Sequence, residues 1–226
     1  MKVQQVTRVL NEIQSRRILG KYQLNQNKYL FAKNIETCIE VTNQLKYPLV
    51  MKVVSDKIVH KSDFGGVQIG LNNLEDVKNA YNIIIRNALL KNVKEDEIDG
   101  VSIQEMENGL EEILIGVKKD PVFGPVILVG LGGVLVELMK DVSLGICPLD
   151  DDDIYKMLKK LKGYPLLNGY RGKKQADIAA LVETVKKVQE LVLNEPDILE
   201  MDLNPVMVKE QGKGCMIVDA RIVMKN

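Results

Sequence analysis

The order of helix-like and strand-like patterns along the chain constrains its fold more than any other feature. Apolar residues recur at helical spacing in residues 5–19, 35–46 and 74–90, and short apolar or β-branched runs typical of strands lie between and after them. Helices and strands alternate without the strict repetition of a parallel sheet, so the pattern predicts an α+β fold. The other predicted helices are 151–161 and 177–193, and the predicted strands are 49–54, 67–71, 101–106, 113–117, 126–129, 134–139, 143–148, 198–208 and 215–223.

A break in the pattern at Glu107-Asn108-Gly109 predicts where the chain divides. With 226 residues, the chain is long enough for two lobes that each bury a core. We therefore predict an N-terminal lobe of residues 1–106 and a C-terminal lobe of residues 107–226.

Charge and cysteine content exclude several classes of function. Lys plus Arg and Asp plus Glu each number 31 and tryptophan is absent, so neither nucleic acid nor an anionic membrane is an expected partner. Cys38, Cys147 and Cys215 are too far apart for a disulfide framework or a zinc motif, which favours a reducing compartment. The N-terminus does not resemble a signal peptide, and the longest apolar stretch, residues 126–139, is too short to span a bilayer. We expect a cytoplasmic protein.

The single histidine lies in a glycine-rich run, VHKSDFGGV, at residues 59–67. Imidazole is nucleophilic at neutral pH and can accept and release a phosphoryl group. Gly65 and Gly66 would expose backbone N–H groups to a phosphate, and Asp63 adds a polar group to the same loop. His60 is therefore a candidate phosphoryl carrier, and the alternative is that it caps a turn.

Lys52 lies in the middle of the apolar strand 49–54. Strand alternation places Lys52 on one face with Val50 and Val54, so its ammonium group must either reach solvent or meet an anion. A phosphate ligand and a protective edge-strand lysine are equally compatible with the strand pattern alone. The histidine loop that follows directly favours the phosphate ligand.

Oxygen-bearing side chains alternate with apolar residues near the C-terminus. Glu200, Asp202 and Asn204 fall on one face of the predicted strand 198–208, and Asp219 lies on the next strand. Carboxylate and amide oxygens suit a hard cation such as Mg²⁺. The alternative is a solvated polar face, although the surrounding residues of both strands are mainly apolar.

A second glycine run, Gly130-Leu131-Gly132-Gly133, lies between two predicted strands. It does not match the dinucleotide-binding pattern, because no helix follows it. The run predicts a tight hairpin, and the exposed N–H groups of Gly130, Gly132 and Gly133 could also receive a phosphoryl group. Glu111 and Glu112, which open the strand after the candidate hinge Gln104-Glu105-Met106, are candidates to hold a ribose.

Taken together, seven segments resemble the ATP-grasp β subunit of ADP-forming acyl-CoA synthetases, that is, ADP-forming acetate–CoA ligases, which are relatives of succinyl-CoA synthetase. The segments occur in order over almost the whole chain, so the match is specific even though no single segment is. They are Tyr47–Lys52, His60–Val67, Gln104–Met106, Asp120–Pro125, Gly130–Gly133, Leu203–Pro205 and Asp219–Arg221.

The resemblance implies an ATP-grasp fold in which two α+β lobes hold ATP or ADP between them. It implies that Lys52 contacts the phosphates and that Glu112 lies near the ribose. It also implies that Gln104, Glu105 and Met106 form a hinge that borders the adenine.

The resemblance further implies that Asn204 and Asp219 hold Mg²⁺, with Asp202 as an additional candidate ligand. His60 would be the second histidine of a phosphohistidine relay and would accept the phosphoryl group beside the nucleotide. The implied reaction converts acyl-CoA, ADP and phosphate to a carboxylic acid, ATP and CoA.

The chain has no second histidine and no segment that reads as a CoA-binding domain. The resemblance therefore implies an α subunit that carries the CoA-binding domain and the first phosphohistidine, in an α₂β₂ assembly. Two alternatives are an ATP-grasp carboxylate ligase without phosphohistidine and a non-catalytic ATP-sensing module. The resemblance also implies that the acyl site lies on the α subunit.

Overall fold

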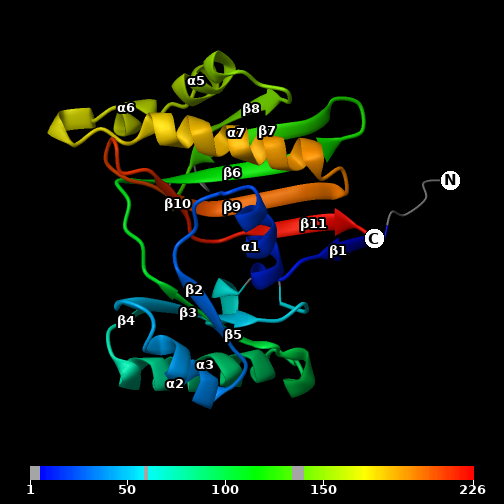
Figure 1. Ribbon diagram of the computed structural model, residues 1–226, viewed down its shortest axis with the longest axis vertical. Coiled ribbons are helices and arrows are strands. Elements are labelled where there is room, and N and C mark those ends of the chain that lie inside the picture. The colour runs from blue at the N-terminus through cyan, green and yellow to red at the C-terminus, as the bar shows by residue number, and fades with distance from the viewer. Residues whose placement is uncertain (1–5, 59–60, 134–139) are drawn as a thin grey trace. The chain divides into compact units, whose positions relative to one another are not determined.

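The computed structural model describes residues 6–58, 61–133 and 140–226, which form two compact units (Figure 1). One unit is Asn27–Met106, and the other combines Met1–Gln26 with Glu107–Asn226. The division after Met106 coincides with the predicted lobe boundary, whereas residues 1–26 group with the C-terminal segment. Strand pairing explains this grouping, because Thr7–Val9 pairs antiparallel with the C-terminal strand Arg221–Lys225.

The unit Asn27–Met106 is an antiparallel sheet whose strand order is β2-β5-β3-β4. Its strands are β2 (Tyr29–Ala32), β3 (Leu49–Val54), β4 (Val67–Leu71) and β5 (Gly100–Glu105); its helices are α2 (Ile35–Thr42) and α3 (Leu74–Leu90), with short 3₁₀ turns η1 (Ser62–Phe64) and η2 (Glu95–Glu97). Met51 and Ile103 of the central strands enter one core with Val77 and Ile84 of α3. Because strand residues alternate between faces, the intervening positions of β3 and β5 lie on the opposite face.

The predicted helix 74–90 is confirmed residue for residue by α3. Asn73 caps it, since its side-chain oxygen accepts a hydrogen bond of 2.9 Å from the backbone N–H of Asp76. The helix buries the residues at helical spacing that the sequence indicates, namely Val77, Ala80, Ile84 and Ala88. Within the described residues, no helix is both long and apolar enough to cross a membrane.

The other unit is built on an antiparallel sheet of order β1-β11-β9-β6-β7-β8, and β10 pairs with β9 beside this path. Its strands are β1 (Thr7–Val9), β6 (Glu111–Asp120), β7 (Gly124–Leu131), β8 (Val142–Ile146), β9 (Ile198–Val208), β10 (Cys215–Ile217) and β11 (Arg221–Lys225); its helices are α1 (Glu12–Lys21), α5 (Asp151–Lys159), α6 (Tyr164–Leu167) and α7 (Ile178–Asn194), with the 3₁₀ turn η3 (Tyr170–Gly172). The predicted strand 198–208 is confirmed by β9 at both ends.

Helix α7 lies along the strands of this sheet and covers one of its faces (Figure 1). Val185 and Leu191 of α7 share a core with Ile115 of β6 and Leu203 of β9. Glu200, Asp202 and Asn204 of β9 are not part of this core and lie on the other face. This separation leaves one sheet face available for polar chemistry.

Several predicted helices and strands differ from the structure, and β2 was not predicted at all. Residues 5–19 do not form one helix, because the pairing of β1 with β11 holds residues 7–9 extended and the helix begins only at Glu12, after the cap Asn11. The predicted strand 215–223 is divided into β10 and β11. Helix α2 ends at Thr42 rather than at residue 46. The predicted strand 134–139 lies outside the described residues.

Candidate nucleotide and metal site

Lys52 lies in the middle of β3 on the sheet face opposite the α3 core. Its neighbours Met51 and Val53 both enter that core, and Lys52 itself is 5% exposed. In the antiparallel register, Lys52 is opposite Ser102 of β5, and Gln104 lies two residues further along β5 on the same face. Strand β3 pairs with β4 on one side and β5 on the other, so the edge-strand interpretation of Lys52 is wrong.

Ser102 is a polar residue of this face that sequence reasoning did not identify. It is 0% exposed, and its hydroxyl oxygen has no hydrogen-bond partner among the described residues. A buried hydroxyl without a partner costs about 1–3 kcal/mol, so a native structure seldom keeps one without a reason. The signal for Ser102 is its register with Lys52, which cannot be read before the pairing of β3 with β5 is known.

The predicted hinge Gln104–Met106 is held by hydrogen bonds to its own unit. The side-chain amide of Asn27 donates to the Gln104 side-chain oxygen at 2.9 Å and to the Glu105 carbonyl at 2.7 Å. The Met106 N–H donates to the Pro48 carbonyl at 2.9 Å. Gln104 is completely buried, whereas the Met106 side chain is partly exposed. Of these residues, Met106 therefore offers the apolar side chain against which an adenine ring can pack.

The glycines after the histidine are required by the turn that they form. Gly65 has a φ of 75°, which is the left-handed region that favours glycine. A Cβ atom on Gly66 would lie 2.6 Å from the Phe64 ring and 2.8 Å from the Lys61 carbonyl oxygen. These two positions fix a tight turn directly after η1.

The same turn lies beside the strand that carries Lys52. The Val53 N–H donates to the Gly66 carbonyl at 2.9 Å, and Val67 pairs with Lys52 across β3 and β4. The side chain of Asp63 is exposed. His60 lies outside the described residues, so its proposed role rests on its place in the sequence next to this turn.

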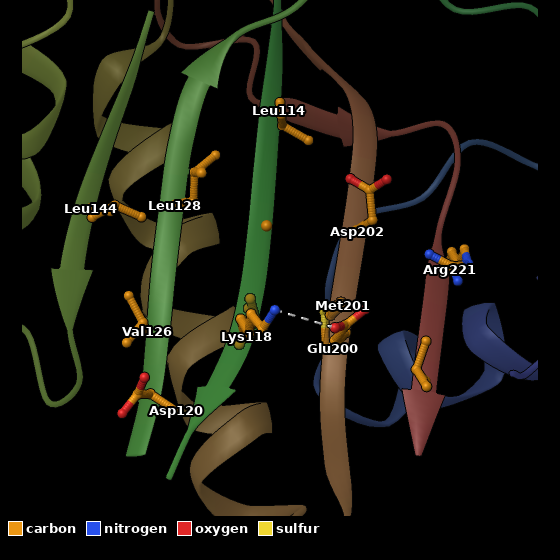
Figure 2. Close-up of a pocket in the computed structure, with 13 residues that line it drawn as sticks. Leu114, Lys118, Asp120, Val126, Leu128, Leu144, Glu200, Met201, Asp202 and Arg221 are labelled. Atoms are coloured by element: carbon orange, nitrogen blue, oxygen red, sulfur yellow. Dashed lines mark ion pairs between the residues drawn. The ribbon is translucent and has the colours of Figure 1, made fainter. Parts of the chain in front are cut away.

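Glu200, Asp202 and Asn204 lie on the face of β9 away from α7, as strand alternation predicts. Figure 2 shows Glu200 and Asp202 on this strand, with β6 on one side and β11 on the other. Asp202 is opposite Gly116 of β6 and Arg221 of β11 in the antiparallel register. The carboxylate of Asp202 therefore has a neighbour without a side chain on one strand and a guanidinium-bearing residue on the other.

Burial raises the pKa of the Asp202 carboxyl above its ordinary value, since desolvation disfavours the charged form. Arg221 opposes this shift, and the negative charge of Asp219 adds to it. Asp219 is itself half-buried, and its carboxylate accepts a hydrogen bond of 2.9 Å from the Ala220 N–H. Asp202 and Asp219 are thus close enough to influence one another electrostatically.

The predicted metal ligands are two carboxylates and one amide. Among the residues that the structure describes, no group of three His, Cys, Asp or Glu side chains is placed to hold a metal ion. A site here would therefore also need the side-chain oxygen of Asn204, which is exposed, or oxygens of the nucleotide itself. An oxygen-only donor set that includes phosphate oxygens is the one that Mg²⁺ prefers.

The structure brings Glu112 together with the second glycine run. The Gly132 N–H donates to the Glu112 carbonyl, and a Cβ atom on Gly132 would lie 2.7 Å from Cβ of Glu112. A Cβ atom on Gly133 would be 3.8 Å from a carboxylate oxygen of Glu112. The predicted tight hairpin is wrong, because Gly130 and Leu131 are the last residues of β7 and the next described strand that pairs with β7 begins only at Val142. The pairing of Ile113 with Leu131 instead places the end of β7 beside the ribose candidate.

A pocket of about 510 Å³ lies on the open face of the larger sheet (Figure 2). One wall is apolar, and the other carries charged side chains, including the ion pair of Lys118 with Glu200 at 3.8 Å. Its lining residues include Leu114, Gly116, Lys118, Asp120, Val126, Leu128, Leu144, Glu200, Asp202 and Arg221. Sequence reasoning identified Glu200 and Asp202 of this set but gave no role to Arg221, whose position opposite Asp202 depends on long-range strand pairing.

Comparison with known protein families identifies the family to which the chain belongs. The model of the ATP-grasp domain family matches residues 2–224 of the chain. The chain belongs to the ATP-grasp domain family. The predicted fold class is therefore confirmed, and both sheets of this ATP-grasp domain are antiparallel, as their strand pairs show.

Relatives of this ATP-grasp domain fall into two length classes. The domain is 38% identical over 99% of its length to the β subunit of ADP-forming acetate–CoA ligase I of Pyrococcus furiosus and covers 95% of that subunit. It is 43% identical over 94% of its length to the ADP-forming 4-hydroxybutyrate–CoA ligase of Nitrosopumilus maritimus but spans only 30% of that longer protein. The same domain thus occurs as a separate subunit and as part of a longer chain.

Solved structures support the same relationship. The acetyl-CoA synthetase 1 of Candidatus Korarchaeum cryptofilum, crystallised with coenzyme A and a nucleotide analogue, superposes with a TM-score of 0.90. That match has 38% sequence identity and covers 96% of this ATP-grasp domain and 94% of that chain.

Proposed function

We propose that this chain is the nucleotide-binding β subunit of an ADP-forming acyl-CoA ligase. Such an enzyme makes ATP from ADP and phosphate while acyl-CoA is converted to the free acid and CoA. The observation that carries the proposal is the match over 95% and 91% of the two separate β subunits of Pyrococcus furiosus. The face of β3 and β5 with Lys52 and the face of β9 with Asp202 supply charged groups suited to a nucleotide.

In this proposal, each candidate residue binds one part of the nucleotide. Lys52 neutralises phosphate oxygens, and Met106 at the hinge packs against the adenine. Glu112 binds the ribose hydroxyls, while the glycine runs at residues 65–66 and 130–133, which carry no side chains, let the phosphates approach the backbone closely. Fixed cationic and N–H donors are effective here because phosphoryl transfer depends mainly on positioning and charge neutralisation.

Asn204, Asp219 and Asp202 would hold Mg²⁺ together with the nucleotide. The donor set fits the ion, since all three side chains offer oxygen and the carboxylates compensate its charge. When bound, Mg²⁺ would draw charge from the phosphate oxygens. The raised pKa of Asp202 fits this role as well, because a buried carboxylate that is unfavourable alone is stabilised by a cation.

His60 carries the phosphoryl group in the proposed relay. A ring nitrogen of His60 attacks the phosphorus of a phosphohistidine on the partner subunit, and that histidine leaves. A terminal oxygen of ADP then attacks the phosphorus on His60, which forms ATP and regenerates the free imidazole. Each step is an in-line displacement between positioned groups, so neither requires free phosphate in the site.

The proposed partner is an α subunit with a CoA-binding domain and the first phosphohistidine, in an α₂β₂ assembly. The two Pyrococcus furiosus relatives are named as β subunits, which supports a partner subunit. The Korarchaeum enzyme has been crystallised with coenzyme A, Mg-AMPPCP and a phosphohistidine segment that points towards the nucleotide site. That arrangement supports a relay in which a phosphohistidine reaches the nucleotide site.

The cysteines support the proposal of a cytoplasmic location. Cys38, Cys147 and Cys215 are all buried free thiols. Burial raises their pKa values to about 11, 11 and 12, respectively, so the thiols are protonated and unreactive at neutral pH. We propose that they serve packing only.

Phosphorylation of the full chain by γ-labelled ATP and Mg²⁺ tests this function. Because the chain has one histidine, His60→Ala removes every phosphohistidine at once. We expect acid-labile, base-stable label on the wild type and none on the variant, with ATP binding measured in parallel and retained by both. Lys52→Met serves as a matched control, since it should lose label together with ATP binding.

Two results would contradict the relay. ATP binding without any label on the wild type would favour a carboxylate ligase that transfers the phosphoryl group directly, or an ATP sensor. Label that persists in His60→Ala would place the carrier on another residue. Substitution of Asn204 and Asp219 then separates the two alternatives, because a sensor tolerates loss of the metal and a ligase does not.

A further inference from the structure

Arg221 on β11 is a half-buried cation that the proposed function has not used. Its side chain lines the pocket on the open face of the sheet, directly opposite Asp202 in the strand register (Figure 2). The Nε–H group of Arg221 is fully buried and has no hydrogen-bond partner among the described residues. A donor of the guanidinium group is therefore unsatisfied in the pocket wall.

An unsatisfied, charged donor is expensive in the folded state. Leaving a buried donor without a partner costs about 1–3 kcal/mol, and more for a charged group. Native proteins retain such groups mainly where a ligand or an ion supplies the missing bond. A planar guanidinium with several N–H groups matches the oxygens of a phosphate, which it can bind through two parallel hydrogen bonds.

The neighbours of Arg221 indicate what kind of anion it binds. Asp219 lies two residues earlier in the chain, and Asp202 and Asn204 follow one another on the same face of the adjacent strand β9. These acids would repel a lone anion, but they attract one that arrives with a divalent cation. Gly116, on the other side of Asp202, has no side chain to block that approach.

We propose that Arg221 binds the terminal phosphoryl group of the Mg²⁺-bound nucleotide through its guanidinium N–H groups. The inference rests on the proposed function and adds to it a residue that distinguishes di- and triphosphates from monophosphates. Arg221 contributes the positive charge on one side of the phosphoryl group, and the metal ligands Asp202 and Asp219 serve the cation on the other.

A merely structural role for Arg221 would give a different result. If Arg221 only held Asp202 in place, its removal would alter stability and metal binding without regard to the number of phosphates on the nucleotide. Phosphate binding predicts that the effect depends on that number. Affinities for AMP, ADP and ATP in the same variant therefore separate the two roles.

The experiment measures binding of AMP, Mg-ADP and Mg-ATP to the full chain by calorimetry. We expect Arg221→Met to weaken ADP and ATP binding about 10- to 100-fold, because charge-assisted hydrogen bonds are lost. The AMP affinity of this variant should stay within about two-fold of the wild-type value. The ADP and ATP affinities of Arg221→Lys should lie between those of the wild type and Arg221→Met, because lysine keeps the charge and loses the paired donors. Lys118→Met is the matched control, since Lys118 lines the same pocket but is exposed and paired with Glu200, and it should change each affinity by less than about three-fold.

Wild-type affinity for ATP in both Arg221 variants would overturn the inference while leaving the proposed function intact. An equal loss of AMP and ATP binding would likewise overturn it. If Arg221→Met does not fold, as judged by circular dichroism, Arg221→Lys alone decides between these outcomes. Failure of the wild-type chain to bind any adenine nucleotide would instead overturn the proposed function and this inference with it.

Discussion

A buried ion pair in α1 offers a sharp test of how the larger unit is held together. Glu12 and Arg16 are one helical turn apart, and their side chains are both 0% exposed. The Arg16 Nε–H donates to a Glu12 carboxylate oxygen at 3.1 Å, and the Arg16 guanidinium also donates to the carbonyl of Val218. The pair therefore ties α1 to the segment that immediately precedes Asp219.

Arg16→Met removes the cation and leaves the Glu12 carboxylate buried without its charge partner. Breaking a buried pair in this way costs about 3–5 kcal/mol, which is a large part of a typical total stability of about 5–15 kcal/mol. The double variant Glu12→Gln/Arg16→Met removes both charges, so it should recover about 0.5–3 kcal/mol relative to Arg16→Met. Arg17→Met is the surface control, because Arg17 is exposed on the same helix, and it should cost less than about 0.5 kcal/mol.

Urea unfolding followed by far-ultraviolet circular dichroism measures these differences, since the chain has no tryptophan for fluorescence. With a denaturant slope of about 3 kcal/mol per M, Arg16→Met should lower the midpoint by about 1–2 M. A loss of less than about 1 kcal/mol in Arg16→Met would refute the reasoning. So would a double variant as unstable as the single one, since the penalty is assigned to the unpaired carboxylate.

Three further predictions concern the candidate site. Lys52→Met should weaken ATP binding about 10- to 100-fold in calorimetry, because a buried cation that neutralises phosphate is lost. An unchanged ATP affinity would show that Lys52 does not bind the nucleotide. For Asp202, whose folded-state pKa is raised, the folded protein binds more protons, so stability falls as pH rises from about 4 to the raised pKa. Asp202→Asn should therefore be more stable than the wild type at pH 7 without Mg²⁺, and the advantage should vanish below about pH 4 in thermal unfolding; a constant difference at all pH values would contradict this. Gly132→Ala should lower the free energy of unfolding by about 1–3 kcal/mol, because the new Cβ atom would lie 2.7 Å from Cβ of Glu112. A melting temperature equal to that of the wild type would show that the backbone can shift to accommodate the Cβ atom without loss of stability.

Elements that depend on local pattern were predictable from the sequence. Helix α3 agrees with its prediction because cap, apolar spacing and length all point to the same bounds. Strand β9 agrees because the polar residues Glu200, Asp202 and Asn204 alternate with apolar residues in its middle and the flanking residues are apolar. Residues 7–9 were wrongly assigned to a helix, since their extended conformation comes from pairing with β11, more than 200 residues away, and no local signal reports it.

The candidate site shows the same division between local and long-range information. Lys52, Asp202 and the glycine runs stand out because each is unusual within its own segment. Ser102 and Arg221 look ordinary in the sequence, and they become candidates only when the strand register places them opposite Lys52 and Asp202. A pattern along one strand indicates which residues share a face, but it does not indicate which residues of the next strand they meet.

Both units use an antiparallel sheet in the same way, and this explains where the chemistry lies. Helices α2 and α3 in one unit, and α7 in the other, take the apolar residues of alternate strand positions into a core. The remaining positions carry the polar groups. The residues directly before and after Lys52 and Asp202 along their strands therefore pack in a core. A substitution at Lys52 or Asp202 can therefore change ligand binding without removing an apolar contact, whereas one at Met51 or Leu203 would disturb the core first. This separation is what makes the binding tests on Lys52 and Arg221 interpretable as tests of chemistry rather than of folding.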